Sequence, residues 1–230
     1  KFIRKITQSK PRIKTKMKRF VMWDLFSGYN SVGSFFRQKG FRVISIEINP
    51  QLAKRTGAIC ADIRKVDFDA LVRKHGTPDF IWASPVCTPW SHATPLVQRK
   101  TKEIKKLGDL ARFTVKLITK IKPKYFCIEN PAATDLHKQT YMKNLPKTEC
   151  SQCQYGRPFQ KNTTIWNNLN LQLKTCTHKK HKVVLGSNYG GTPGCRHWAK
   201  KKHKIKIPYQ LVKSIYFQVK KKLGKPEKIV

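Results

Sequence analysis

Short apolar runs alternate with longer amphipathic stretches from about Arg19 onward, and this alternation restricts the chain to few folds. Runs of four residues suit buried strands, whereas the stretches between them have the apolar spacing of helices. The runs that we predict as strands are Phe20–Trp23, Val43–Ile46, Phe80–Ala83 and Tyr125–Ile128. The repeated order of strand and helix predicts an α/β fold with a Rossmann-like, doubly wound, mostly parallel sheet.

Three stretches have clear helical patterns. Ser31–Gln38 stops just before Gly40, and Thr101–Ile121 carries apolar residues at helical spacing. Pro208 suits the first turn of a last helix, which we expect to return to the core. The apolar face of that helix consists of Leu211, Val212, Ile215, Tyr216 and Val219.

Changes in composition divide the chain into four regions. Residues 1–18 are basic, contain no acid and are predicted to form a flexible arm. Residues 19–168 form the α/β domain, 169–205 a small basic insert, and 206–230 the C-terminal helix that returns to it. From Cys150 to the end, Glu227 is the only acidic residue.

The charge of the chain indicates a polyanionic partner. It contains 49 Lys and Arg against 12 Asp and Glu, a formal net charge of +37. Counterion release would favour binding of such a chain to nucleic acid. A lysine-rich composition can also reflect an A/T-rich coding genome, although the resulting field would still attract DNA or RNA.

No apolar run is long enough to cross a membrane, and no signal peptide is evident. The 7 cysteines are an odd number, and Cys60 and Cys127 lie in apolar, strand-like runs. We therefore expect reduced thiols in an intracellular protein that is neither secreted nor bound to a membrane.

Polar residues follow the four predicted strands and a further strand that we expect just before Asp62. They are Asp24–Gly28, Glu47, Asp62, Cys87 and Glu129–Pro131, in chain order. Because ligands bind at the carboxyl ends of parallel strands, we expect these residues to surround one site.

Several of these motifs resemble those of the C5-cytosine-specific DNA methyltransferases. Asp24–Gly28 is similar to the family's cofactor loop, Ser84–Ser91 to its nucleophile loop and Glu129–Pro131 to its acidic loop. Cys153–Trp166 is similar to a variant of the eighth motif, which we associate with compact enzymes of phages and large DNA viruses. The resemblance spans roughly residues 19–220, with the motifs in family order. It implies that 19–168 is a catalytic domain and 169–205 a target-recognition-like insert.

The resemblance implies S-adenosylmethionine as the cofactor. Glu47 would accept hydrogen bonds from the ribose hydroxyls, Ile48 would lie against the adenine, and Asp62 would accept from the adenine amino group. Alternatively, Glu47 and Asp62 are solvated loop acids. The cofactor residues that we predict are Asp24, Phe26, Ser27, Gly28, Asn30, Glu47, Ile48, Asp62 and Pro85.

The resemblance also assigns two catalytic residues. Cytosine C5 is a poor nucleophile, and addition of the Cys87 thiolate to C6 would activate it. Glu129 would engage N3 and the exocyclic amine, holding a proton that makes C6 attackable. The alternatives are an incidental cysteine and a surface glutamate that opens a helix.

Ser91, Asn130 and Lys161 are the predicted substrate-binding residues. Asn130 would brace its loop, and Lys161 would bind the cytosine carbonyl or a phosphate as a point charge, unless it is a solvated surface lysine.

This sequence departs from the family pattern at three positions. Asn30 replaces a glycine, Val86 replaces a proline, and Thr163 stands where many relatives have arginine. Asn tolerates left-handed backbone angles, so the cofactor turn can survive.

A cluster of cysteines and histidines raises the alternative of a zinc site, although we predict no metal. The spacings Cys150–Cys153 and Cys176–His178–His181 suit zinc, and Cys195 and His197 follow. Against zinc, the resemblance places Cys153 in a core strand.

The leading hypothesis is a monomeric enzyme that methylates double-stranded DNA after flipping out a cytosine. The motifs also fit an RNA cytosine-C5 methyltransferase. A third hypothesis is a catalytically inactive scaffold that binds nucleic acid. It is supported by the departures from the family pattern at Asn30, Val86 and Thr163. The presence of both Cys87 and Glu129 speaks against it.

Overall fold

The structure is a computed structural model that describes residues 18–177 and 206–225. The predicted basic arm, apart from Lys18, lies outside these residues, and so does most of the predicted basic insert.

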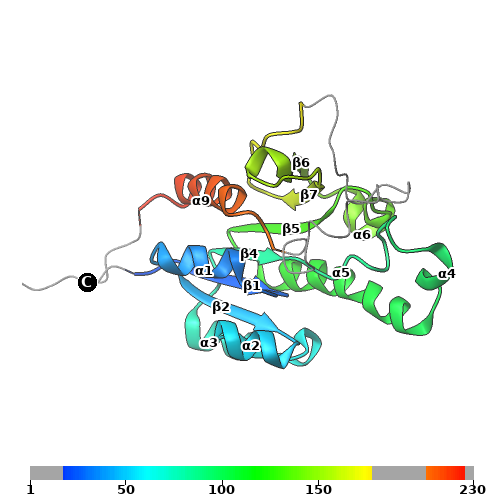
Figure 1. The fold of residues 1–230 in the computed structure, drawn as a ribbon. Helices are drawn as coiled ribbons and strands as arrows, with labels where there is room; N and C mark the ends of the chain where they lie inside the picture. Colours follow the sequence, from blue (N-terminus) through cyan, green and yellow to red (C-terminus); the bar gives the residue numbers. More distant parts are fainter. Residues whose placement is uncertain (1–17, 178–205, 226–230) are drawn as a thin grey trace, which may run out of the picture.

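A seven-stranded sheet forms the centre of the described chain, with the order β3-β2-β1-β4-β5-β7-β6 (Figure 1). Neighbours among the first five strands are parallel, whereas β7 is antiparallel to both β5 and β6. The predicted doubly wound, mostly parallel sheet is therefore confirmed. The strands are β1 (Val21–Leu25), β2 (Arg42–Glu47), β3 (Ile59–Cys60), β4 (Phe80–Ala83), β5 (Tyr125–Pro131), β6 (Lys147–Ser151) and β7 (Asn162–Asn167).

Helices connect the strands and lie on both faces of the sheet. They are α1 (Ser31–Gln38), α2 (Pro50–Thr56), α3 (Phe68–His75), α4 (Leu96–Arg99), α5 (Lys102–Ile121), α6 (Thr140–Lys143) and α9 (Tyr209–Leu223). Single turns of 3-10 helix occur at η1 (Ile63–Lys65), η2 (Leu136–Lys138) and η3 (Gln152–Tyr155). The three helices predicted from sequence are present, and their starts agree to within one residue, since α5 and α9 begin one residue after Thr101 and Pro208.

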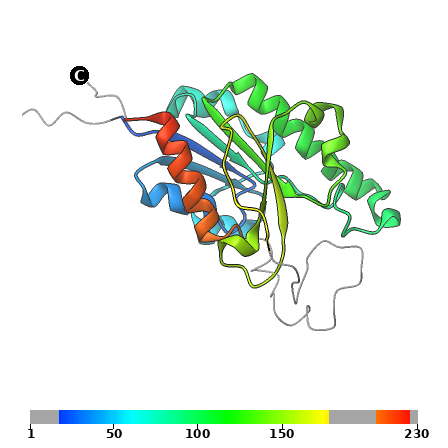
Figure 2. The same ribbon diagram turned by 90° about the horizontal axis from the view of Figure 1, so that it is seen from above.

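Alternation along the strands creates two cores, one on each face of the sheet. Met22, Phe80 and Trp82 face a cluster that includes residues of α1 and α9, whereas Trp23 and Ile81 face a cluster that includes residues of α3 and α5. Figure 2 shows α1 and α9 together on one side of the sheet and α5 on the other. Because both faces are covered, β1 and β4 are apolar at every position except Asp24, which belongs to the site.

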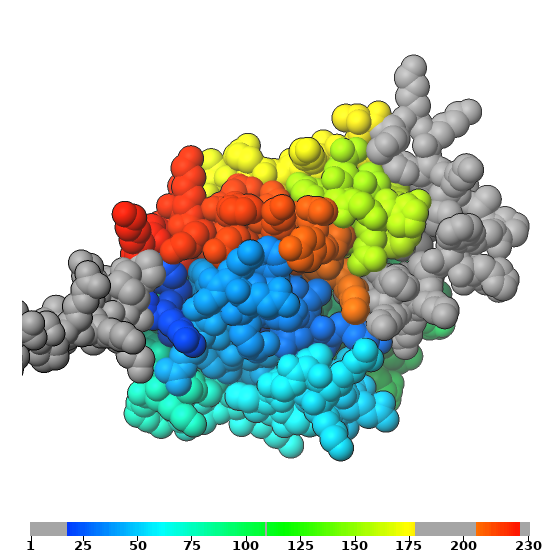
Figure 3. All heavy atoms as spheres, turned by 60° about the vertical axis from the view of Figure 1, so that its left-hand side comes forward, coloured from blue at the N-terminus to red at the C-terminus, as the bar shows by residue number. Residues whose placement is uncertain are grey.

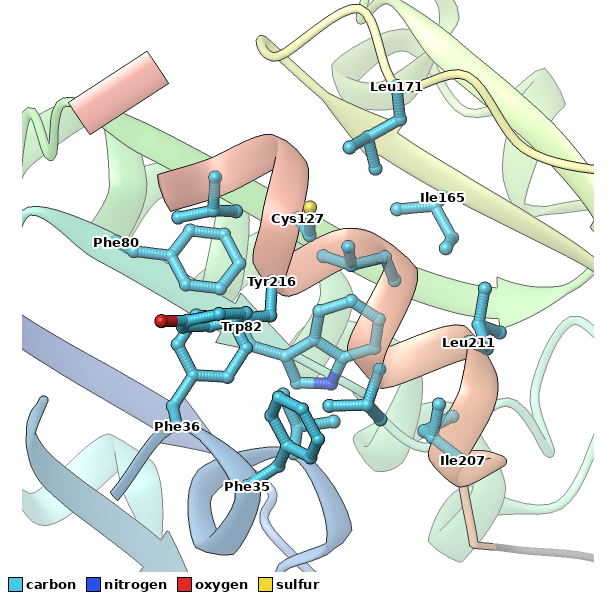
Figure 4. Packing of buried hydrophobic residues seen from close by; sticks show 14 of the residues in the cluster. Phe35, Phe36, Phe80, Trp82, Cys127, Ile165, Leu171, Ile207, Leu211 and Tyr216 are labelled. Atoms are coloured by element: carbon cyan, nitrogen blue, oxygen red, sulfur yellow. The ribbon is translucent and has the colours of Figure 1, made fainter. Parts of the chain in front are cut away.

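Aromatic side chains join the last helix to the first. The Phe36 ring of α1 lies 5.3 Å from that of Phe80 and 5.4 Å from that of Tyr216 on α9. These rings form the centre of the core in Figure 4, and Figure 3 shows α9 lying across α1. The C-terminal helix therefore packs against the same core as α1.

We expect Phe36→Ala to destabilise the protein by about 3–5 kcal/mol, because it leaves a cavity among buried rings. Phe36 is fully buried, whereas Phe217 on α9 is 57% exposed. Phe217→Ala should therefore cost about 1 kcal/mol or less. Urea unfolding curves of both variants measure the difference, and equal losses would contradict this view of the core.

Candidate active site

The loop between β1 and α1 contains three left-handed residues. Phe26, Gly28 and Asn30 have φ angles of 58°, 52° and 55°. The expectation that asparagine can replace the family's second glycine is therefore confirmed for the backbone. The Asn30 side chain is buried, where Oδ1 accepts from Ser45 Oγ at 3.3 Å and Nδ2 donates to the Thr56 carbonyl at 3.4 Å.

Two buried carboxylates hold this loop. Asp24 Oδ2 accepts from the Gly33 N–H at 2.9 Å, and Glu47 Oε2 accepts from the Gly28 N–H at 2.7 Å. Glu47 Oε1 also accepts from the Asn49 N–H at 2.9 Å. Burial raises the pKa of Asp24 to about 7, against the opposing effect of the hydrogen bond from Gly33.

Gly33 is a residue of this loop that the sequence analysis missed. A Cβ atom at Gly33 would overlap Asn30 Oδ1 and would lie 2.6 Å from Asp24 Oδ2. Only glycine lets α1 begin this close to the two side chains. The signal in the sequence was a glycine in the first turn of a predicted helix, where it costs helix stability without an evident purpose.

A first cavity of about 230 Å³ opens at the carboxyl ends of β2 and β3. Its lining includes Phe26, Glu47, Ile48, Asp62, Arg64 and Leu107. The Ile48 side chain is 64% exposed and forms part of the rim. Glu47, Ile48 and Asp62 are therefore brought together, as predicted.

Arg64 is a second residue of this cavity that sequence reasoning missed. Its Nε and Nη2 donate to the two oxygens of Asp62 at 3.0 and 2.7 Å. These bonds hold the pKa of Asp62 at about 2. The carboxylate predicted to accept from adenine therefore already accepts from a bidentate guanidinium, which leaves only its remaining lone pairs.

A second cavity of about 320 Å³ contains the residues predicted for chemistry. It adjoins the first cavity, because Phe26, Ser84 and Val86 line both. Predicted site residues in its lining are Asp24, Phe26, Ser27, Gly28, Pro85, Cys87, Glu129, Asn130 and Lys161. The structure thus brings the cofactor loop, the nucleophile loop and the acidic loop together around one hollow, which we call the reaction cavity.

Cys87 lies in the loop after β4, and two sets of hydrogen bonds fix this loop. The Cys87 carbonyl accepts from the N–H groups of Trp90 and Ser91 at 2.9 and 2.8 Å. Asn130 Nδ2 donates to the Pro85 carbonyl at 3.0 Å, so Asn130 braces the nucleophile loop from β5. Val86 in place of proline is accommodated within this arrangement, 37% exposed.

The thiol of Cys87 lies among charged groups. Burial raises its pKa, the Glu129 carboxylate raises it further, and the Lys161 ammonium opposes both. Cys87, Glu129 and Lys161 are therefore electrostatically coupled across the reaction cavity.

Glu129 is 7% exposed, and its Oε1 has no hydrogen-bond partner among residues 18–177 and 206–225. The buried Asn130 Oδ1 likewise has none within these ranges. Buried polar atoms are nearly always satisfied, so two such atoms beside a cavity point to a ligand with hydrogen-bond donors.

Two predicted site residues do not line either cavity. Asn30 is used inside the loop, and Ser91 is 6% exposed, with its Oγ accepting from the Ala93 N–H at 3.2 Å. This geometry therefore does not support the prediction that these two side chains contact cofactor or substrate directly. Trp82 and Ile207 line the reaction cavity instead, and nothing in their sequence context singled them out.

The predicted cysteine and histidine cluster is only partly described. Cys150 is buried in β6, and burial raises its pKa to about 12. Cys153 belongs to η3, so its expected place in a core strand was wrong, and its thiol is hydrogen-bonded to that of Cys176. His178, His181, Cys195 and His197 lie outside the described residues. Within the described ranges, no three Cys, His, Asp or Glu residues form a metal-binding group.

The parallel order β3-β2-β1-β4-β5, followed by the reversed strand β7 and then by β6, defines a Rossmann-like fold of the S-adenosylmethionine-dependent methyltransferase type. A comparison with family models matches residues 20–197 to the model described as "C-5 cytosine-specific DNA methylase". The chain belongs to this family, whose members use S-adenosylmethionine as the methyl donor.

Among solved structures, the chain is similar to a mutant of Spodoptera frugiperda DNMT2, with 15% identity and a TM-score of 0.47. The match covers 70% of this chain and 56% of that protein, so the chain spans little more than half the length of this neighbour. A comparison with curated proteins gives no match. Among the residues described, no helix has the length and apolar character needed to span a membrane.

We expect Gly33→Ala to destabilise the protein by about 1–3 kcal/mol, because the new methyl group must displace Asn30 or Asp24. Displacement should also weaken ligand binding at the adjoining cavities. Gln38→Ala, at an exposed position of the same helix, is the control and should unfold at nearly the wild-type temperature. Thermal unfolding and calorimetric titration with S-adenosylmethionine measure both effects, and wild-type behaviour of the Gly33 variant would contradict this packing.

Alkylation of Cys87 should depend on its two charged neighbours. The thiolate is the reactive form, so a raised pKa moves the reaction to higher pH. Glu129→Gln removes one cause of the raised pKa and should shift the rate profile to lower pH. Lys161→Met removes the opposing charge and should shift the profile to higher pH.

The measurement is the rate of iodoacetamide labelling of Cys87 against pH, resolved by peptide mass spectrometry. The exposed Cys60 reports reagent activity in every sample. Profiles that coincide for wild type and both variants would disprove the coupling.

Proposed function

We propose that the chain is a cytosine-C5 methyltransferase that acts on double-stranded DNA, with Cys87 as the nucleophile. The observation that carries this proposal is the shared lining of one cavity by Cys87, Glu129 and the cofactor loop. The family supports methylation of cytosine C5, and the charge supports a nucleic-acid substrate, whereas the choice of DNA over RNA rests on the resemblance alone. A monomeric state, an intracellular location and a phage or viral type are parts of the same proposal.

The residues present fit S-adenosylmethionine. Glu47 offers carboxylate oxygens at the end of β2, and Ile48 and Leu107 add apolar surface to the same cavity. This cavity joins the reaction cavity at Phe26. S-adenosylmethionine is elongated, with an aromatic adenine at one end and a charged amino acid at the other, so it needs two joined cavities of this kind. We therefore assign the adenosine part to Glu47, Ile48 and Asp62, and the amino-acid part to the loop from Asp24 to Gly28.

When bound, the cofactor supplies an electrophilic methyl group. Cys87 then adds as its thiolate to C6 of a flipped cytosine, which makes C5 nucleophilic. Glu129 holds a proton at N3 and draws electrons from C6. After C5 has taken the methyl group and lost its proton to water, the bond between Cys87 and C6 breaks, which restores the thiolate and returns the N3 proton to Glu129.

The positions of the supporting residues fit this sequence of steps. Asn130 keeps the nucleophile loop against β5, so Cys87 and Glu129 can address the same ring. Lys161 brings a cation to the same cavity, where it stabilises the thiolate and can contact the cytosine carbonyl.

We expect DNA that contains 5-fluorocytosine to trap the enzyme covalently in the presence of S-adenosylmethionine, because the fluorine at C5 cannot leave as a proton. Cys87→Ser should abolish the adduct, whereas Cys60→Ser, at an exposed position, should keep it. Denaturing electrophoresis with labelled DNA measures the adduct. An adduct that persists in the Cys87 variant would place the nucleophile elsewhere.

Labelled S-adenosylmethionine with separate DNA and RNA substrates distinguishes the alternatives. Transfer to RNA alone would replace the DNA proposal with an RNA methyltransferase. Transfer to neither, with cofactor binding confirmed by calorimetry, would leave a nucleic-acid-binding scaffold.

A further inference from the structure

An open cavity of about 480 Å³ lies beside the reaction cavity. It lies where the orange start of α9 meets blue α1 and the yellow-green segment around η3 in Figure 3. Its lining includes Ser31, Ser34, Arg157, Lys206, Tyr209 and Gln210. Ser31 and Ile207 line both this cavity and the reaction cavity, so a ligand in one adjoins a ligand in the other.

The charge of this cavity has one sign. Its described lining contains two cations, Arg157 and Lys206, and no carboxylate. Lys206 Nζ lies 5.2 Å from the centre of the Tyr29 ring, which places the ammonium over the cofactor loop. Lys161 adds a third cation in the adjoining reaction cavity. A cavity with this lining favours an anion.

Arg157 is fixed and incompletely satisfied. Its Nη2 donates to the Lys206 carbonyl at 2.6 Å, which orients the guanidinium at the wall of the cavity. Its buried Nε has no acceptor among the residues described. A planar, oriented guanidinium with donor capacity left over is suited to an oxyanion.

The start of α9 adds to the same preference. The helix has 15 residues and no side-chain cap at its N-terminus, and Tyr209 and Gln210 of its first turn line the cavity. The first N–H groups of a helix have no partner within it, and they carry partial positive charge. This contribution supplements the two side-chain cations.

We propose that this cavity binds a phosphodiester group of the nucleic-acid strand that carries the target cytosine. The inference rests on the proposed function, because it takes the reaction cavity as the place of the flipped base. Arg157 and Lys206 would hold the backbone beside that base and so position the base against Cys87. The carboxylate of S-adenosylmethionine is an oxyanion as well, and the experiment must separate the two sources.

The experiment compares two site variants with two controls in the full chain. Lys206→Gln removes a charge and leaves the carbonyl that binds Arg157 in place, so the start of α9 keeps its contact. Arg157→Gln removes the guanidinium. The controls are Arg73→Gln on α3 and Lys116→Gln on α5, both at exposed positions. Both residues lie in the second halves of helices that run back toward the amino ends of the strands, whereas the cavities lie at the carboxyl ends.

Binding of fluorescent mixed-sequence duplex DNA, and of RNA in parallel, is measured by anisotropy over a range of salt concentrations. Each site variant should bind about tenfold more weakly at low salt, and the slope of log K against log salt should fall by about one. The controls, which each lose the same single charge, should keep the wild-type slope. Affinity for S-adenosylmethionine without nucleic acid should be unchanged in all four variants.

Two outcomes would overturn the proposal. Site variants that change the slope no more than the controls would show that the cavity holds no phosphate. Loss of cofactor affinity with an unchanged slope would assign the cavity to the cofactor carboxylate. Thermal unfolding is recorded for each variant. If Arg157→Gln has a lower unfolding temperature than the other variants, its weaker binding can result from lost structure, and the salt slope of Lys206→Gln alone tests the proposal.

Failure of the proposed function has a different signature. In that case the wild-type protein would transfer no methyl group to DNA or RNA, whatever the salt slopes. If only this inference fails, the wild-type protein transfers methyl groups while the site variants bind like the controls.

Discussion

The hydrogen bonds from two backbone N–H groups to buried carboxylates are the interaction on which the rest of the site depends. Asp24 receives the Gly33 N–H and Glu47 receives the Gly28 N–H, so the loop after β1 is tied to its own helix and to β2. These bonds hold a chain of left-handed residues that would otherwise be costly. Without them, the wall shared by the two cavities would have no fixed shape. The close packing at Gly33 shows how little room this arrangement leaves.

The reversed strand β7 brings to the site a residue from its amino end, which a strand parallel to the others could not do. Parallel strands bring only their carboxyl ends to this edge, whereas β7 brings its amino end, and with it Lys161. The C-terminal segment then closes the same region, because α9 packs on α1 and Ile207 reaches the cavity lining. Residues from both ends of the described chain therefore shape one hollow.

The sequence predicted most of the fold because its signals are local. Apolar runs and helical spacing found four central strands and three helices, and polar residues at strand ends found Glu47, Cys87 and Glu129. The strands β6 and β7 were not predicted from such runs, and their positions follow from pairing with distant segments. The sheet order likewise depends on these pairings.

The residues that were missed depend on the directions of neighbouring side chains. Arg64 matters because it turns back onto Asp62 two residues before it, and Gly33 matters because the side chains of Asn30 and Asp24 approach it. Asn30 was assigned to the cofactor because of its place in a motif, whereas its side chain is occupied by Ser45 and Thr56. Sequence position identified the loop correctly but not the direction of each side chain.

The charges around Cys87 affect how readily its thiol is oxidised. A buried thiol beside a carboxylate is held in its protonated form, and protonated thiols react slowly with peroxides and disulfides. A ligand that neutralises Glu129 removes one cause of this state, and Lys161 then favours the thiolate. The free protein thus keeps the thiol of the reaction cavity in its less reactive form, and a ligand that neutralises Glu129 would favour the reactive thiolate.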